Sequence, residues 1–361
     1  MNIYLLLLLI LILIGLRIYP IKFNKNYLSK EYTACIKGIF ILIVFCSHII
    51  TYIPYNPTQD NLALFFVKNI GQLMVTLFLF YSGYGVYESI KKKKIKYING
   101  MPKNRIFKTL FHFDIIVLLF ILINCIMGYG NNVLEILSSL IAWSSVGNSN
   151  WYIFVILVLY FITYLSFIIF KKENKNAIIL CTLLTILTII ALSTYKESYW
   201  YNTMLCYPFG MMFSYHKNKI NKLMLNNKTY YLTLVFLFLL FIGIRRVSTI
   251  STLYYSVFAI IFVIIVVMLT MKSKINNKYL KWFGDNLFYI YILQRIPMLI
   301  LSRLSYSNTH PYRFVIICFI STILLTIIYG KLLPKIDKYI FNIKINNFFK
   351  KLEVVYGKKR D

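Results

Sequence analysis

Long apolar runs separated by short polar segments make up most of the chain. Runs of about 17 to 25 apolar residues are long enough to cross a bilayer as helices, and about eleven such runs can be counted. The expected helices are Ile3–Ile18, Ile36–Ile53, Leu62–Tyr87, Ile106–Met127, Trp151–Phe170, Ala177–Ser193, Tyr199–Tyr215, Tyr230–Ile244, Thr252–Met271, Asn286–Leu304 and Tyr312–Leu333. Because a helix satisfies its backbone hydrogen bonds internally, the pattern predicts an all-α polytopic membrane protein.

Composition narrows this interpretation. Hydrophobic residues make up 59% of the 361 residues and charged residues only 14%, whereas a soluble domain is typically about half apolar and about a quarter charged. The formal net charge of +29 comes from 40 Lys and Arg against 11 Asp and Glu, which in a soluble chain would suggest nucleic acid. Here the basic residues lie between apolar runs, so we expect a lipid bilayer and no nucleic-acid partner.

Lysine-rich connections alternate with lysine-poor ones along the chain. Residues 91–108 (KKKKIKYINGMPKNRIFK) are an example of the first kind, and residues 54–61 (PYNPTQDN) are an example of the second. Positively charged loops stay in the cytoplasm. The alternation therefore predicts a multi-pass protein of the cell membrane, with its N-terminus outside and its C-terminus in the cytoplasm. The run Lys91–Lys94 is interpreted as a solvated topology signal.

The same pattern divides the chain into three parts. Residues 1–30 are expected to form an additional N-terminal transmembrane helix, retained because no cleavage motif follows it, and a cytoplasmic linker. Residues 31–335 form the membrane domain, and residues 336–361 form a basic cytoplasmic tail. The six cysteines lie in or at the ends of apolar runs without metal-ligand spacing, so neither a metal site nor a disulfide framework is expected.

A basic residue and a histidine lie within one apolar run, KGIFILIVFCSH, from Lys37 to His48. Eleven residues of helix rise about 16.5 Å and rotate by only about 20°, so both side chains share one face. An ionisable group at membrane depth costs about 2.5 kcal/mol or more when charged, and it is usually kept for function. The alternative for His48 is a packing role with a hydrogen bond to a backbone carbonyl.

Spacing predicts two further local features. Arg105, Lys108 and His112 are three and seven residues apart, which places them on one face at the start of a helix. Gly83 and Gly85 are expected to let neighbouring helices approach closely.

These segments resemble a known family. KGIFILIVFCSH is similar to the basic-residue, ten-spacer, histidine signature of the acyltransferase 3 family, integral membrane O-acyltransferases that modify extracytoplasmic glycans. Further segments resemble that family in the same order: LFLFYSGYGVYES, KNRIFK, NWYIFVILVLYFITYLSF and NLFYIYILQRIPMLI. The resemblance runs from about Ala34 to Gly330 and leaves out the first helix. Lys37 and Lys108 stand where the family tends to have arginine, and Gln294 stands where it often has histidine.

The resemblance implies about ten family-like helices and a catalytic role for His48 and Lys37. An acyl group, above all acetyl, would pass from acyl-CoA to a hydroxyl of a cell-envelope or exported polysaccharide. Acyl-CoA is then a donor substrate and no bound cofactor is expected. His48 would take a proton from the acceptor hydroxyl, either in direct transfer or after carrying the acyl group itself. Arg105 and Lys108 would hold the donor phosphates by charge-assisted hydrogen bonds.

Five residues are candidates for binding the carbohydrate: Tyr84, Trp151, Tyr152, Arg245 and Arg295. Trp151 and Tyr152 begin a helix at the outer face, where an aromatic belt is the ordinary role and stacking on a sugar is the functional one. Arg245 lies at an outer helix end, where basic residues are depleted. Arg295 lies inside a helix, where it needs an anionic or carbonyl partner.

A second class of function fits the composition equally well. A transporter or flippase for a glycan or lipid-linked intermediate would also combine many apolar helices with buried polar residues. The ordered set of family-like segments and the lack of obvious inverted repeats favour the acyltransferase. A catalytically inactive sensor is the third alternative, and the intact Lys37 and His48 count against it.

Overall fold

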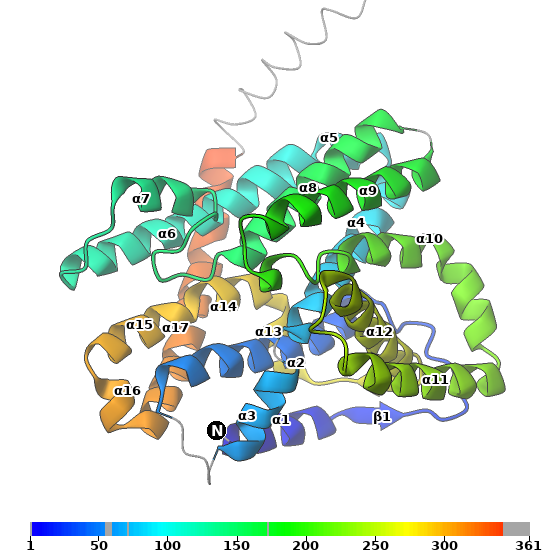
Figure 1. The fold of residues 1–361 in the computed structure, drawn as a ribbon, viewed down its shortest axis with the longest axis horizontal. Coiled ribbons are helices and arrows are strands. Elements are labelled where there is room, and N and C mark those ends of the chain that lie inside the picture. The colour runs from blue at the N-terminus through cyan, green and yellow to red at the C-terminus, as the bar shows by residue number, and fades with distance from the viewer. Residues whose placement is uncertain (1, 55–59, 71, 172, 342–361) are drawn as a thin grey trace, which may run out of the picture.

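The computed structural model describes residues 2–54, 60–70, 72–171 and 173–341, and nearly all of their regular structure is helical (Figure 1). The long helices are α2 (Lys30–Ile49), α4 (Leu73–Lys93), α6 (Lys108–Ile126), α8 (Trp151–Ile169), α9 (Asn174–Ser193), α10 (Cys206–Met224), α11 (Asn227–Arg245), α12 (Thr252–Met271) and α17 (Pro311–Tyr339). The shorter ones are α1 (Asn2–Leu13), α3 (Asn61–Ile70), α5 (Ile95–Asn99), α7 (Val133–Leu140), α13 (Lys278–Asp285), α14 (Leu287–Leu293), α15 (Arg295–Arg303) and α16 (Tyr306–Thr309).

The predicted all-α polytopic membrane fold is confirmed, although the number of spans differs. Within the described ranges, seven helices are long and apolar enough to cross a membrane, or eight if α3 and α4, bent by 44°, count as one span. The predicted helix Tyr199–Tyr215 corresponds to α10, whose second half is polar (HKNKINK). The predicted helix Asn286–Leu304 is interrupted at Gln294, between α14 and α15.

The first predicted helix, Ile3–Ile18, ends early. Helix α1 stops at Leu13, and the chain then forms strand β1 (Leu16–Ile18), which pairs in antiparallel fashion with β2 (Ser273–Ile275) after α12. The 12 residues of α1 rise only about 18 Å, against about 30 Å for the hydrocarbon core. The apolar run alone gave no sign of this pairing, because its strand partner lies more than 250 residues away in the sequence.

Helix α2 is the most deeply enclosed candidate span, with 78% of its apolar window buried. It begins at the N-cap Ser29, whose side chain accepts a hydrogen bond from the Tyr32 amide. Its closest partner is α13, because Gly38 and Gly284 let the two backbones meet. An added Cβ would lie 1.9 Å from the Leu280 carbonyl oxygen at Gly38, and 1.8 Å from the Ala34 carbonyl oxygen at Gly284.

Helices α4 and α10 make a second close crossing. A Cβ at Gly83 would lie 2.0 Å from the Tyr207 carbonyl oxygen, and one at Gly210 would lie 2.2 Å from that of Phe80. The packing role predicted for Gly83 is confirmed. The one predicted for Gly85 is wrong, because a Cβ there meets nothing within 4 Å.

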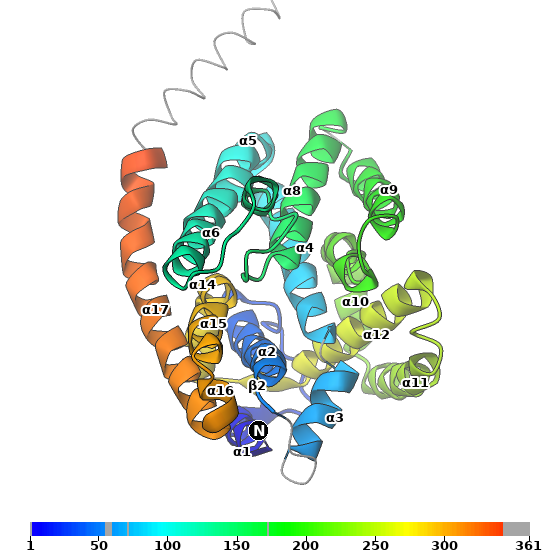
Figure 2. The same cartoon turned by 60° about the vertical axis from the view of Figure 1, so that its left-hand side comes forward.

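The two sides of the bundle enclose α2. In Figure 2, α17 runs along one flank beside α14, α15 and α16, while α9, α10, α11 and α12 lie toward the other flank. Helix α2 lies between these groups, and its C-terminal end is next to α14 and α15 in both views. This arrangement places the last turn of α2, with His48, inside the bundle.

Candidate active site

His48 lies in the last turn of α2, just before the short 3₁₀ segment η1 (Ile50–Tyr52). Its ring faces that of Tyr291 on α14, with centroids 6.1 Å apart. The Nδ1 atom is buried and has no hydrogen-bond partner among the described residues. The packing alternative, a ring nitrogen bonded to a backbone carbonyl, is therefore not what is found at Nδ1.

Arg295 and Gln294 stand where α14 gives way to α15, beside the end of α2. Arg295 is close enough to His48 and Tyr291 to act electrostatically on both. Its Nε and the Oε1 of the fully buried Gln294 have no hydrogen-bond partner in the described part of the chain. No carboxylate in the described ranges pairs with this guanidinium, and its positive charge beside the imidazole favours an anion.

Tyr152 joins this group from α8. Its ring meets Tyr291 edge-on, with centroids 5.5 Å apart. The Ser149 hydroxyl, in the turn before α8, lies near Tyr291 and is buried. Three of the predicted site residues, His48, Arg295 and Tyr152, are thus brought together by Tyr291. Sequence reasoning did not single out Tyr291 or Ser149, although Tyr291 is the second of two tyrosines in the family-like segment NLFYIYILQ.

Trp151 lies one step farther from His48. Its ring packs edge-on against Tyr152 at 6.1 Å and against Tyr199 at 5.9 Å. Nearby, the Lys196 ammonium lies 3.8 Å from the centre of the Trp143 ring and donates to the Trp143 carbonyl oxygen at 2.7 Å. Burial lowers the pKa of Lys196. These contacts fix the connections around the start of α8, and with them the position of Tyr152.

Arg105 belongs to a separate group. It lies in the π-helical segment η2 (Pro102–Phe107), and its Nε donates to the Tyr97 hydroxyl at 3.0 Å. The guanidinium also lies 5.9 Å from the centre of the Tyr160 ring. The Tyr160 hydroxyl is within 2.9 Å of the Ser82 Oγ. One of the five N–H donors of Arg105 is used in this way, and no described carboxylate pairs with it.

Lys108 is neutralised by a residue that the sequence did not point to. Asp337 on α17 receives Lys108 Nζ at 2.5 Å on one oxygen and His112 Nε2 at 2.7 Å on the other. Helix α17 runs to Tyr339, so Asp337 is part of a helix although the basic tail was expected to begin at 336. Asp114, which follows on α6, has a buried Oδ1 with no partner in the described ranges.

The prediction that Arg105, Lys108 and His112 share one face is wrong for Arg105. Lys108 and His112, one helical turn apart, both reach Asp337, whereas Arg105 turns toward Tyr97 on α5. The π-helical turn that precedes Lys108 explains the difference, because its i→i+5 hydrogen bonds change the angle between successive residues.

Lys37 lies on α2 eleven residues before His48, as the spacing predicted, and it is only partly exposed. Its nearest charged neighbours are Asp285 and Lys30. The Asp285 carboxylate is already held by Lys281 at 2.9 Å. Lys37 makes no ion pair within 4 Å in the described part of the structure, so its charge remains available.

Tyr84 and Arg245 are not part of the group around His48. The Tyr84 hydroxyl accepts a hydrogen bond from Lys217 Nζ on α10 at 2.7 Å. Arg245 donates to Asn69 Oδ1 on α3 at 2.7 Å. Both side chains therefore hold neighbouring helices in place.

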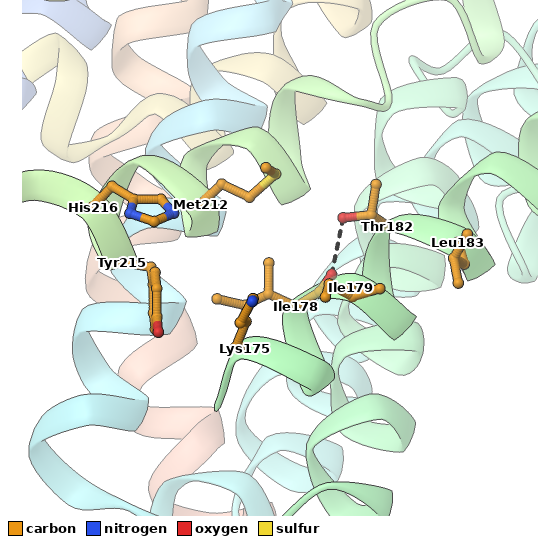
Figure 3. A pocket seen from close by; sticks show the side chains of 8 residues that line it. All are labelled: Lys175, Ile178, Ile179, Thr182, Leu183, Met212, Tyr215 and His216. Atoms are coloured by element: carbon orange, nitrogen blue, oxygen red, sulfur yellow. Dashed lines mark hydrogen bonds between the residues drawn. The ribbon is translucent and has the colours of Figure 1, made fainter. Parts of the chain in front are cut away.

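Two apolar cavities lie away from all the predicted site residues. One, of about 310 Å³, opens between α9 and α10, with Lys175 and His216 as its main polar groups (Figure 3). Thr182 in its wall is satisfied by its own helix, since its hydroxyl donates to the Ile178 carbonyl at 2.9 Å. The other, of about 510 Å³, is lined by residues of α1, α2, α13 and α17. Among the described residues, no group of three or more His, Cys, Asp or Glu side chains is placed to hold a metal ion.

One comparison with known proteins gives a match. The family model described as an acyltransferase domain matches residues 30–330. No curated protein and no solved structure matches the chain. The matched range begins at the first residue of α2 and ends within α17, so it contains His48, Tyr291, Arg295 and Arg105 but neither α1 nor Asp337.

Proposed function

The chain belongs to the acyltransferase 3 family, whose model covers residues 30–330, and from this premise we propose a donor, an acceptor and a catalytic base. The family makes the chain an acyltransferase in the membrane. We propose that it transfers an acyl group, above all acetyl, from cytosolic acyl-CoA to a hydroxyl of a cell-envelope or exported carbohydrate. His48 acts as the general base.

The observation that carries this proposal is the buried, unpartnered Nδ1 of His48 beside Arg295 and Tyr291. A general base needs a nitrogen free to take a proton, and a developing oxyanion needs fixed donors or positive charge nearby. His48 supplies the first, whereas the Arg295 guanidinium and the Tyr291 hydroxyl supply the second.

The direct reaction balances with these groups alone. His48 takes the proton of the acceptor hydroxyl as its oxygen attacks the thioester carbonyl carbon. The negative charge on the carbonyl oxygen is stabilised by Arg295 and Tyr291. The carbon–sulfur bond then breaks, the ester forms, and the CoA sulfur leaves with the proton that His48 had taken. In the covalent alternative His48 carries the acyl group first, which would give ping-pong kinetics.

The distribution of lysines supports a direction for the proposed reaction. With lysine-rich connections in the cytoplasm, the amino end of α2 faces the donor and His48 lies toward the outside, where Tyr152 and Trp151 meet the carbohydrate. Lys37 and Arg105 then lie on the donor side. Lys108 reaches donor phosphates only by exchanging its carboxylate partner Asp337. Tyr84 and Arg245 would likewise have to leave Lys217 and Asn69 to bind substrate.

The test compares two histidines. His48→Ala should lower acetyl transfer by about 10²- to 10⁴-fold, the usual contribution of a general base. His310→Ala is the matched control, because His310 is exposed and its side-chain contacts in the described chain are local, with Tyr306 and Thr309. Transfer is measured with labelled acetyl-CoA in membranes containing equal amounts of each protein. Full activity of His48→Ala would refute the assignment of His48 as the general base. Glycans that accumulate unmodified with every variant and with the unmodified chain would favour a transporter.

A further inference from the structure

A basic cavity lies at the lysine-rich end of the bundle, apart from the candidate active site, and two lysines of the run Lys91–Lys94 line it. It has a volume of about 350 Å³ and lies where α4 ends, α5 begins and the connection from α8 enters α9. Its lining consists of three lysines, three isoleucines and one asparagine: Ile90, Lys91, Lys94, Ile95, Ile98, Lys171 and Asn174. We propose that this cavity binds the nucleotide part of the acyl-CoA donor, so the inference rests on the function proposed above.

The charge of the cavity fits phosphate groups. None of its seven lining residues is acidic. Lys91 is partly neutralised, since it pairs with Glu88 and donates to the Ser214 carbonyl oxygen at 3.3 Å. Lys94 and Lys171 have no ion pair within the described ranges. Two exposed ammonium groups from different connections therefore meet at one cavity, and ammonium groups bind phosphate oxygens by charge-assisted hydrogen bonds.

Lys94 takes a backbone conformation that suits glycine better than lysine. It lies between α4 and α5 with φ +48° and ψ −137°, and its amide closes α4 by donating to the Ile90 carbonyl at 2.7 Å. Glycine adopts such a conformation without steric conflict, whereas a residue with a Cβ is strained there. A lysine at this strained corner, with its side chain lining the cavity, supports a functional use of that side chain.

The cavity also has an apolar wall. Ile90 and Ile98 are buried at 3% and 2% exposure and line the same space as the lysines. Ligand pockets usually combine apolar surfaces with a few polar groups in about 300 to 1,000 Å³. This combination suits a base ring joined to phosphates better than an isolated phosphate. The volume, at the small end of that range, has room for the nucleotide but not for the whole donor.

The elements that line the cavity also lead toward the candidate active site. Ile95 and Ile98 line it from α5, and Tyr97 on the same helix receives the hydrogen bond from Arg105. Beyond Arg105, α8 runs from its end near Lys171 back to Tyr152 beside Tyr291, a rise of about 26 Å between Ile169 and Tyr152. A donor held in the cavity would therefore extend past Arg105 into the bundle, with its thioester toward His48.

The experiment measures binding to the purified full chain in nanodiscs of neutral phosphatidylcholine. The probes are coenzyme A and adenosine 3′,5′-bisphosphate, which carries the base and phosphates without the pantetheine arm. Lys94→Gly and Lys171→Gln remove the two free charges, and Lys93→Gln is the matched control from the same lysine run, since Lys93 does not line the cavity. Lys94→Gly also relieves the backbone strain, so its thermal stability should equal or exceed that of the unmodified chain.

The unmodified chain should bind both probes, and each cavity variant should weaken both by about ten- to a hundredfold, the usual effect of losing a hydrogen bond to a charged group. Lys93→Gln should bind as the unmodified chain does. If coenzyme A binds but neither cavity variant weakens it, the cavity assignment is wrong while the donor stands. If the unmodified chain does not bind coenzyme A, the proposed function itself fails.

An anionic lipid headgroup also carries a phosphate that the lysines could bind. A further arm of the experiment distinguishes this lipid from the nucleotide. Nanodiscs containing phosphatidylglycerol should leave the affinity for adenosine 3′,5′-bisphosphate nearly unchanged. If phosphatidylglycerol displaces the bisphosphate and Lys94→Gly abolishes that competition, the cavity is a lipid site and the nucleotide proposal is overturned.

Discussion

Two glycines on α4, separated by one residue, test how the bundle is packed. A Cβ at Gly83 would lie 2.0 Å from the Tyr207 carbonyl oxygen on α10, whereas a Cβ at Gly85 would meet nothing within 4 Å. The same change, glycine to alanine, should therefore have opposite effects at the two positions.

The magnitude follows from the contact. At Gly83 the distance must open from 2.0 Å to the 3.4 Å at which ordinary contact begins, a shift of about 1.4 Å between two backbones. Overpacking costs about 1–3 kcal/mol, and alanine regains up to about 1 kcal/mol of helix propensity. With that gain subtracted, Gly83→Ala should destabilise the chain by up to about 2 kcal/mol, and Gly85→Ala should be neutral or stabilise it by up to about 1 kcal/mol.

The assay is thermal unfolding in one detergent, followed by the fluorescence of the four tryptophans at a fixed scan rate. Gly83→Ala should melt below the unmodified chain, and Gly85→Ala should melt at or above it. If Gly83→Ala melts as high as Gly85→Ala, then α4 and α10 do not cross at this contact and the packing argument is wrong.

Two further predictions concern the charged groups. Asp337→Asn removes the carboxylate shared by Lys108 and His112, so it should destabilise the chain by about 1–3 kcal/mol and, by freeing Lys108, tighten coenzyme A binding. Unfolding measurements check the stability against Asp285→Asn, which removes the exposed pair with Lys281 and should shift stability by less than about 1 kcal/mol. Binding measurements against the unmodified chain check the affinity. Arg295→Gln should lower kcat by about 10²- to 10³-fold and leave coenzyme A affinity unchanged, in steady-state kinetics with Arg313→Gln as an exposed control.

Each of these has a result that contradicts it. Unchanged stability of Asp337→Asn would mean that the two contacts on α6 contribute nothing. A loss of coenzyme A affinity in Arg295→Gln, with kcat preserved, would place Arg295 on the donor side instead of beside the reacting atoms.

Much of the framework was determined by the sequence alone. Apolar runs of spanning length predicted most of the helices. The family-like segments, in their order along the chain, predicted the family that residues 30–330 match. The common face of Lys37 and His48 follows from the helical period alone, because both belong to the single helix α2. Such features depend only on neighbours within one helix, which a sequence pattern can represent.

Contacts between helices were decided only by the tertiary structure. Nothing near His48 in the sequence indicates that Tyr291 and Arg295, more than 240 positions later, lie beside it. The helical period states which side chains share a face but not which helix that face meets. For this reason Asp337 was missed as the partner of Lys108.

Local irregularities of the backbone also decided contacts that the sequence did not predict. The π-helical turn at Pro102–Phe107 directed Arg105 away from Lys108, against the ideal period. Lysines first interpreted as a topology signal were brought together with Lys171 by the turn at Lys94, whose positive φ no sequence pattern marked. The sequence therefore determined the helices and the reaction class. The packing of those helices, through close crossings and one strained turn, decided which charges meet.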